Sequence, residues 1–374
     1  MAMTELALID HHVHGILTGE LDRPALEIAL TESGLAPPPG TTSFDSMLGF
    51  GVRRWCAPVL DLEPRASADE YVQRRLELGG AEVARRLLTA AGVAVWLVDT
   101  GFKSDAVTTP DVLAQLSGTP AREVARLESI AEHVVSSGAG ASGYHDAMTS
   151  AVREAAVDAV GFKTVAAYRG GLQLDPARPS AAEVEAAAGK WLREIDTGAP
   201  ARLVDRVLIR HGIWAAIDTG LPLQFHAGFG DTDSRLAEAD PALLHDFLLA
   251  SQPSKTPVML LHCYPYHRQA GAMANLFPHV YMDVGVALNY VGARSATVLA
   301  EALEITPFPK MLYSSDAFGL PELHYLGAVG FRRDIATVTG AFVADGAWSA
   351  ADADRVADMI GSGNARRVYP LGAG

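Results

Sequence analysis

Short apolar runs recur along the chain, and most of them end in polar residues. The first run, LALIDHHVHG at residues 6–15, is typical of a strand that is buried on both faces, as in a parallel sheet. Similar runs predict further strands at 93–100, 124–129, 159–165, 221–227, 258–264, 280–285 and 310–316. Amphipathic patterns between the runs predict helices, for example at 180–195, 201–219 and 242–250.

Eight strands that alternate with helices predict an α/β fold, a (β/α)8 TIM barrel rather than an open doubly wound sheet. No Gly-x-Gly-x-x-Gly follows a predicted strand, as a dinucleotide-binding fold would require. Residues 15–92 are too long for an ordinary connection and carry a helical pattern over 68–91. We expect one domain over 1–374, in which 15–92 is a helical insertion after strand 1 that serves as a lid or as structural decoration. Residues 350–369 are expected to be closing helices, with Asn364 at a cap or turn.

Composition narrows the class of partner. The chain has 374 residues, of which 49% are hydrophobic, and 30 Lys and Arg against 44 Asp and Glu give a net charge of −14. This charge disfavours nucleic acid and anionic membranes as partners. The chain has two cysteines, Cys56 and Cys263, and neither a signal peptide nor a run long enough to span a membrane. We expect a cytoplasmic protein that acts on a small molecule, and leave open whether it forms a homo-oligomer.

Residues that can bind a metal or transfer a proton lie where the predicted strands end. His12 and His14 are two apart on the first strand, so both side chains project to the same side, and neutral histidine is a common metal ligand. Four later predicted strands carry Lys163, His226, His262 and Asp316. Any one of these residues could be a buried histidine, a surface lysine or a helix cap. Together, at the end of a barrel where active sites form, they predict a metal centre.

This arrangement resembles the amidohydrolase superfamily of metal-dependent TIM barrels. Several stretches resemble more closely the amidohydrolase-like domain that some fungal and plant proteins carry fused to a glutamine synthetase domain. The resemblance covers roughly residues 1–15 and 93–372 and includes no synthetase segment, so we expect no ligase activity. The stretches that carry it are GFKTVAAYRGGL (161–172), QFHAGFGDTD (224–233), LLHCYPYHRQAG (260–271), VYMDVG (280–285) and SSDAFGLPELHYLGA (314–328).

The resemblance implies an enzyme, a metal-dependent hydrolase that cleaves a non-peptide C–N amide bond with metal-activated water. It implies one or two divalent ions, with Zn²⁺ the first choice and Mn²⁺ or Fe²⁺ as alternatives. The expected ligands of one ion are His12, His14, His226 and Asp316.

Three of the six candidate residues at the strand ends have expected roles other than holding the first ion. Asp316 is the expected catalytic proton-transfer group as well as a ligand. His262 either binds a second ion or acts in catalysis by polarising the substrate carbonyl. Lys163 is either carboxylated and bridges two ions, or stays an amine that binds a substrate carboxylate.

Residues in the loops after these strands are candidates for substrate binding. Arg169 could clamp a carboxylate through two parallel hydrogen bonds, and Asp231 and Asp233 could bind an ammonium group. The fused relatives suggest a γ-glutamyl-type amide. Two other functions stay open: a metal-dependent non-oxidative decarboxylase of a small acid, and a binding protein that has lost catalysis. Further substrate-binding candidates are Tyr168, Tyr264, His267 and Glu322.

Overall fold

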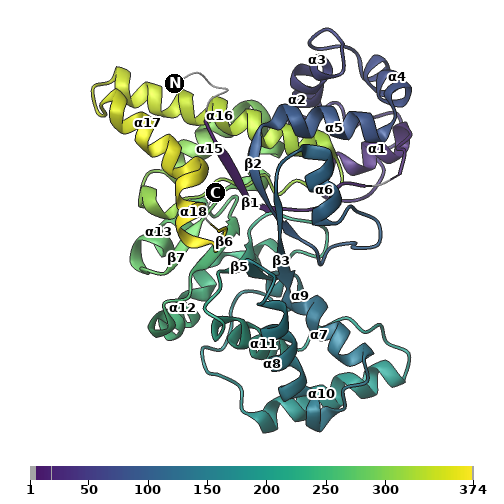
Figure 1. Cartoon of the computed structure of the whole chain (residues 1–374), viewed down its shortest axis with the longest axis vertical. Helices are drawn as coiled ribbons and strands as arrows, with labels where there is room; N and C mark the ends of the chain where they lie inside the picture. The colour runs from purple at the N-terminus through teal and green to yellow at the C-terminus, as the bar shows by residue number, and fades with distance from the viewer. Residues whose placement is uncertain (1–5, 18, 373–374) are drawn as a thin grey trace.

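The computed structural model describes residues 6–17 and 19–372. A seven-stranded parallel sheet runs in the order of the sequence, and each strand pairs with the next one along the chain. The sheet is curled, and helices lie around it, so the architecture is an α/β fold of the TIM-barrel-like kind (Figure 1). The strands are β1 (Leu8–Val13), β2 (Val93–Asp99), β3 (Ala121–Arg126), β4 (Gly161–Thr164), β5 (Leu223–Ala227), β6 (Val258–His262) and β7 (Val280–Met282).

The predicted eighth strand, 310–316, is not a regular strand. It nevertheless lies between β7 and β1, because the backbone N–H of Leu312 donates to Met282 and that of His11 donates to Tyr313, at 3.0 and 3.2 Å. Further along, the N–H of Asp316 donates to the carbonyl of His12 at 3.1 Å. These contacts bring the two ends of the sheet together and place Asp316 beside the end of β1.

Two predicted strands run into helices. The prediction 124–129 is wrong beyond residue 126, since α7 begins at Leu127, and the prediction 280–285 is wrong at its end, since α14 begins at Gly285. In the second case the carboxylate of Asp283 accepts a hydrogen bond from the N–H of Gly285 at 2.8 Å, which starts the helical turn. Such local side-chain bonds compete with strand pairing, and a hydrophobic pattern does not register them.

Among the described residues, five α-helices connect β1 to β2, in the stretch that carries the helical pattern: α1 (Arg23–Ala29), α2 (Met47–Gly51), α3 (Ala57–Val59), α4 (Ala68–Leu78) and α5 (Gly80–Ala91). A π-helical turn, η1 (Val52–Cys56), joins α2 to α3. The predicted helix 68–91 is divided at Gly79, whose φ of 78° no continuous helix can accommodate.

The other helices follow the later strands. Figure 1 shows α1 to α5 gathered at one end of the molecule and α7, α8, α10 and α11 at another. They are α6 (Pro110–Ser117), α7 (Leu127–Ser136), α8 (Tyr144–Ala155), α9 (Ala166–Arg169), α10 (Ala181–Asp196), α11 (Arg206–Ile217), α12 (His245–Ser251), α13 (His267–Leu276), α14 (Gly285–Val291), α15 (Ser295–Ala302), α16 (Pro321–Ala344), α17 (Ala350–Asp358) and α18 (Asn364–Val368). Asn364 begins α18 as a buried residue whose amide donates to the carbonyls of Phe308 and Met311.

The core has two parts that follow the alternation of the strands. In β6, Leu260 joins the large cluster between sheet and helices, whereas Met259 and Leu261 join a small second cluster. The second cluster lies inside the curl, since it unites side chains from strands on opposite sides of the sheet. Tyr369 closes it after α18. None of the described helices is long and apolar enough to cross a membrane.

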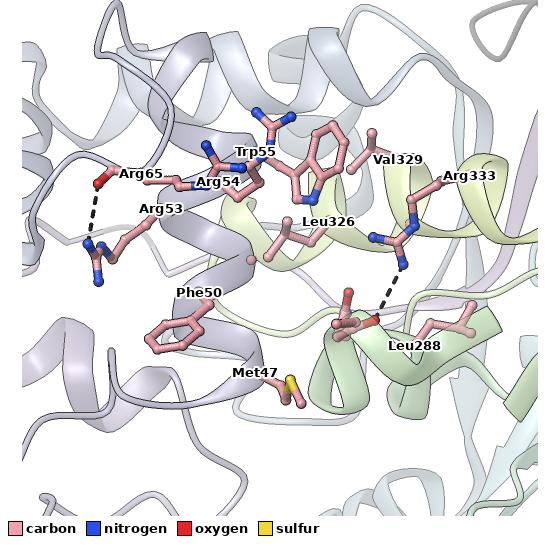
Figure 2. Close-up of a pocket in the computed structure, with 15 residues that line it drawn as sticks. Met47, Phe50, Arg53, Arg54, Trp55, Arg65, Leu288, Leu326, Val329 and Arg333 are labelled. Atoms are coloured by element: carbon pink, nitrogen blue, oxygen red, sulfur yellow. Dashed lines mark hydrogen bonds between the residues drawn. The ribbon is translucent and has the colours of Figure 1, made fainter. Parts of the chain in front are cut away.

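Two of the cavities are lined by several charged residues. One, of ≈ 200 Å³, lies at the carboxyl ends of the strands. The other, of ≈ 490 Å³, lies between η1, α14 and α16 (Figure 2). The described residues that line the two cavities form separate sets, so the second cavity is not part of the first.

Candidate metal centre

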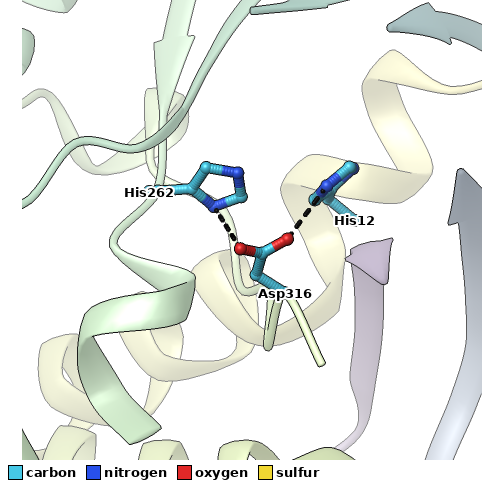
Figure 3. Close-up of side chains that lie close together, drawn as sticks. All are labelled: His12, His262 and Asp316. Atoms are coloured by element: carbon cyan, nitrogen blue, oxygen red, sulfur yellow. Dashed lines mark ion pairs between the residues drawn. The ribbon is translucent and has the colours of Figure 1, made fainter. Parts of the chain in front are cut away.

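The carboxylate of Asp316 lies at the centre of three histidines (Figure 3 shows two of them). Its Oδ1 is 3.1 Å from Nε2 of His12 and 3.6 Å from Nε2 of His14, and its Oδ2 is 3.3 Å from Nδ1 of His262. The ring of His226 lies 4.7 Å from that of His262, centroid to centroid. Strands far apart in the sequence therefore deliver one carboxylate and four imidazoles to a single place.

Lys163 completes the predicted set. Its Nζ lies 3.2 Å from Nε2 of His12, and the side chain is buried. All six residues predicted as metal ligands therefore lie around one cavity or directly beside it.

Backbone geometry at the site is unusual. His262 and Asp316 have φ values of 68° and 50°, in the left-handed region that non-glycine residues rarely adopt. The carboxylate of Asp283 accepts from the N–H of His262 at 2.8 Å and holds that turn in place. The strained backbone turns His262 out of β6, and Asp316 out of the segment 310–316, toward His12.

Hydrogen bonds at Nδ1 fix the orientation of two histidine rings, those of His12 and His14. Nδ1 of His12 donates to Oε1 of Gln224 at 2.8 Å, and the amide of Gln224 donates to the carbonyl of His11 at 2.7 Å. Nδ1 of His14 donates to the backbone carbonyl of Asp99 at 3.2 Å. A histidine that donates from Nδ1 keeps its lone pair on Nε2, the atom that faces Asp316 here, which is the usual arrangement of a metal-binding histidine.

Two observations test whether the residues fit a divalent cation. Within the described chain, Nε2 of His226 and both ring nitrogens of His262 are buried without a hydrogen-bond partner. Buried polar atoms without partners are costly, and a cation would satisfy them. Ligand atoms of His12, His262 and Asp316 lie within 4.8 Å of one another. Imidazole nitrogen with carboxylate oxygen is the donor set that zinc and related ions take, so the residues fit.

The electrostatics of the site favour ligand forms of these side chains. Burial, helped by the charge of Lys163, lowers the pKa of His12 to about 4, and burial holds the pKa values of His226 and His262 well below the usual range. Burial alone would raise the pKa of Asp316, but the neighbouring His262, His12 and His14 outweigh this effect and hold that pKa well below normal. At neutral pH His12, His226 and His262 are therefore neutral imidazoles and Asp316 is an ionised carboxylate.

Lys163 is also shifted. Burial lowers the pKa of Lys163 to about 8, against the attraction of Asp99 and Asp316. An amine with such a pKa gives up its proton more readily than a surface lysine, which suits carboxylation, whereas binding a substrate carboxylate requires the protonated form.

The residues predicted to bind substrate divide into two groups. Tyr168 and Arg169 line the cavity at the metal centre, and the hydroxyl of Tyr168 lies 3.3 Å from Nδ1 of His226. Nη2 of Arg169 is 3.8 Å from Glu132, while its Nε and Nη1 are buried without a partner among the described residues. Arg169 thus has two donor atoms that no described residue occupies.

The other three lie outside this cavity. Tyr264 and His267 stack on each other with ring centroids 6.0 Å apart, and Nε2 of His267 donates to Glu301 at 2.8 Å. Glu322 is fully buried in an ion pair with Arg75. The structure does not bring these three residues together with the metal centre, and their role in substrate binding stays a prediction.

Several residues in the cavity or beside it were not anticipated from the sequence. Arg126 at the end of β3 holds the carboxylate of Asp99 at the end of β2, with Nη2 and Oδ2 2.5 Å apart, and this charge keeps the pKa of Asp99 below normal although burial raises it. Both lie at strand ends, so the reasoning that found the histidines could have found them. Glu32 reaches the cavity from the segment between α1 and α2, where no sequence motif marks it as a functional residue.

The comparisons with known proteins agree with this geometry. The family model described as amidohydrolase matches residues 120–371, and the chain belongs to this family. It is 28% identical to protein fluG of Emericella nidulans over 403 residues, which take in 97% of this chain and 46% of fluG. The chain therefore spans about half the length of this curated relative.

Solved structures resemble the whole chain. A protein of Lactobacillus casei, provisionally named a metal-dependent hydrolase, superposes with a TM-score of 0.85 at 28% identity over 98% of this chain and 96% of its own. Glucuronate isomerase of Caulobacter crescentus matches with a TM-score of 0.65 at 15% identity, over 99% of this chain and 92% of its own. Uronate isomerase of Thermotoga maritima matches with a TM-score of 0.58 at 13% identity, over 98% and 95%. The two isomerases show a shared fold alone.

Proposed function

We propose that this protein is a metal-dependent hydrolase that cleaves a C–N amide bond in a small substrate bearing a carboxylate, with γ-glutamyl-type amides as the leading class. The observation that carries the proposal is the cluster of Asp316 with the buried residues His12 and His262, in which the ring nitrogens of His262 form no hydrogen bond with a described residue. Membership of the amidohydrolase family and the similarity to the Lactobacillus casei protein support it.

The residues that would hold the ion are His12, His14, His226 and Asp316, with Lys163 and His262 available for a second ion. Zn²⁺ suits this donor set, and Mn²⁺ or Fe²⁺ are the alternatives. A bound divalent ion supplies Lewis acidity, which makes a water molecule more acidic and a carbonyl carbon more electrophilic.

The side chains move the protons of the hydrolysis. Asp316, ionised at neutral pH, accepts a proton from the attacking water as the new C–O bond forms. It returns that proton to the amide nitrogen as the C–N bond breaks, so the products are an acid and an amine. His262, neutral at this pH, is placed to stabilise the negative charge that develops on the substrate oxygen.

Arg169 is the residue that we propose to bind the substrate carboxylate, because its Nε and Nη1 are buried donors with no partner among the described residues at the cavity. Glu32 and Asp231 line the same cavity and would suit a positively charged amine at the other end of the substrate. The helical stretch between β1 and β2 supplies Glu32, and we propose that it acts as a lid within a single domain.

We further propose that the protein works in the cytoplasm on a small molecule and needs neither nucleic acid nor a membrane. The net charge of −14 supports the exclusion of polyanionic partners.

The test is a product assay on protein loaded with Zn²⁺. A γ-glutamyl anilide is offered in one reaction and an aromatic acid such as 2,6-dihydroxybenzoate in the other. We expect the release of aniline and no CO2. Release of CO2 alone would establish the decarboxylase instead, and full metal content with neither product over a panel of amides would identify a binding protein.

A further inference from the structure

The larger cavity, bounded by η1, α14 and α16, is lined mainly by apolar side chains and by arginines. Apolar side chains form most of its surface, among them Met47, Phe50, Trp55 and Leu326. Figure 2 shows Trp55 and Val329 close together, with Leu326 beside them on α16. At ≈ 490 Å³ it is within the range of cavities that hold small organic molecules.

The charges at this cavity are all of one sign. Four arginines line it, namely Arg53, Arg54, Arg65 and Arg333, and no described acidic residue does. This is the opposite of the whole chain, whose net charge is −14. A local positive field in an acidic protein selects for an anionic ligand rather than for unspecific contacts.

Three of the four arginines have no acidic partner among the described residues. Arg53 donates to the backbone carbonyls of Ala66 and Arg65, which leave its charge uncompensated. Arg54 lies over the ring of Trp55, with 4.6 Å from its Cζ to the ring centroid, and Arg65 forms no ion pair with a described residue. Of the four arginines, only Arg333 is paired with a described acidic residue, Asp334, at 2.6 Å.

From this combination we propose that the cavity is a second binding site, for a small amphipathic anion whose carboxylate or phosphate meets Arg54 and Arg65 and whose flat apolar body lies against Trp55 and Leu326. An arginine stacked on an aromatic ring keeps its in-plane donors free, so Arg54 binds an anion with its edge while its face stays on Trp55. The exposed rings and chains at the rim, Phe50 and Met47, would be covered by the same ligand.

One contact connects this site to the metal centre. Asn289, which lines the cavity, donates through Nδ2 to the carbonyl of Ser315 at 3.2 Å. Ser315 directly precedes Asp316. A ligand that shifts α14 therefore acts on the backbone that carries Asp316. Occupancy of this second site then alters turnover at the metal centre, an effect that rests on the proposed hydrolysis.

The probes are 2-naphthoate and 2-naphthyl phosphate, with the neutral 2-naphthamide and inorganic phosphate as partial ligands. Binding is followed by calorimetry and by tryptophan fluorescence, and Trp55→Phe shows whether the optical signal comes from this cavity. We expect 1:1 binding of at least one complete probe, with the two partial probes bound at least about tenfold more weakly. A preference between the two complete probes identifies the head group.

Variants locate the site. Arg54→Ala with Arg65→Ala should weaken the binding of the complete probe at least about tenfold. The matched control is Arg178→Ala, because Arg178 also lies over a tryptophan ring, that of Trp214, at 4.4 Å, but outside this cavity. Arg169→Ala, at the metal centre, should leave probe binding unchanged, and a full melting transition for each variant shows that it is folded.

Equal affinity in the double variant and in Arg178→Ala would overturn the proposal, as would loss of binding in Arg169→Ala or equal binding of 2-naphthamide. Binding only to vesicles of anionic lipid, with no 1:1 complex, would assign the patch to a membrane instead. If the probe binds but changes no turnover of any amide, the link through Asn289 is wrong and the site itself stands. The binding measurements need no catalytic activity, so they are independent of the proposed hydrolysis.

Discussion

Gln224 contacts His12 at Nδ1, the ring nitrogen that does not face Asp316. Its Oε1 accepts from Nδ1 at 2.8 Å, while its amide nitrogen donates to the carbonyl of His11. The side-chain amide of Gln224 thus binds both the ring of His12 and the backbone of β1. It leaves Nε2 of His12 as the free lone pair toward Asp316, and this defines the orientation of the proposed ligand.

Gln224→Leu should therefore weaken metal binding by about 10- to 100-fold, the range found for residues that orient a ligating histidine. The expected cause is loss of the fixed tautomer and ring angle of His12. Metal titration with a competing chelator measures the change. Gln252→Leu, in a surface turn after α12, is the matched control and should bind metal as the wild type does. Unchanged affinity in Gln224→Leu would remove this amide from the metal centre.

His12→Ala with His14→Ala should abolish stoichiometric metal, because these two residues supply half of the proposed ligands of the first ion. Elemental analysis of the purified protein measures the content. His245→Ala removes an exposed histidine paired with Asp246 and should change nothing. A double variant that retains one ion per chain would contradict the assignment.

Asp316→Asn should retain most of the metal and lose at least about 100-fold in turnover, which is the scale of general acid–base catalysis. The amide keeps the shape and one oxygen ligand but cannot accept a proton. The comparison is between metal content and kcat of the same preparation. Turnover close to that of the wild type would exclude Asp316 from proton transfer.

Arg169→Ala should reduce kcat/KM for a γ-glutamyl amide by about 2–5 kcal/mol of transition-state binding, since a substrate carboxylate would be left without its partner. Arg169→Lys keeps the charge but not the fork, and should recover part of the loss. The measurement compares the amide with its carboxamide analogue in each variant. Arg202→Ala, in the same cavity but paired with Asp233, is the control. Equal discrimination in wild type and Arg169→Ala would move the role to Lys163.

Glu322→Ala should destabilise the protein by about 3–5 kcal/mol, because it leaves Arg75 buried without its counter-ion. Denaturant unfolding measures the change. Glu77→Ala, which breaks an exposed ion pair with Arg74 on the same helix α4 as Arg75, should cost under about 1 kcal/mol. The predicted role of Glu322 in substrate binding is tested in the same variant at a temperature where it is folded: an altered KM would support it.

The sequence by itself determined much of this protein. Buried strands are marked by continuous apolar runs, and the carboxyl ends of parallel strands meet at one edge, so His12, His226 and His262 could be placed together without coordinates. The resemblance then gave the family, which the comparisons confirm. For these residues, the local hydrophobic pattern is sufficient to predict their position in the fold.

Only the tertiary structure decided the rest. The segment 310–316 reads as a strand but turns out of the sheet at Asp316, and Glu322 reads as a loop residue near a ligand but forms a buried ion pair with Arg75. Glu32 reaches the cavity from a stretch with no catalytic signature. In each case the partner lies far away in the chain and is selected by side-chain packing. Hydrophobic periodicity records which face of an element is buried, but it does not record which distant side chain that face meets.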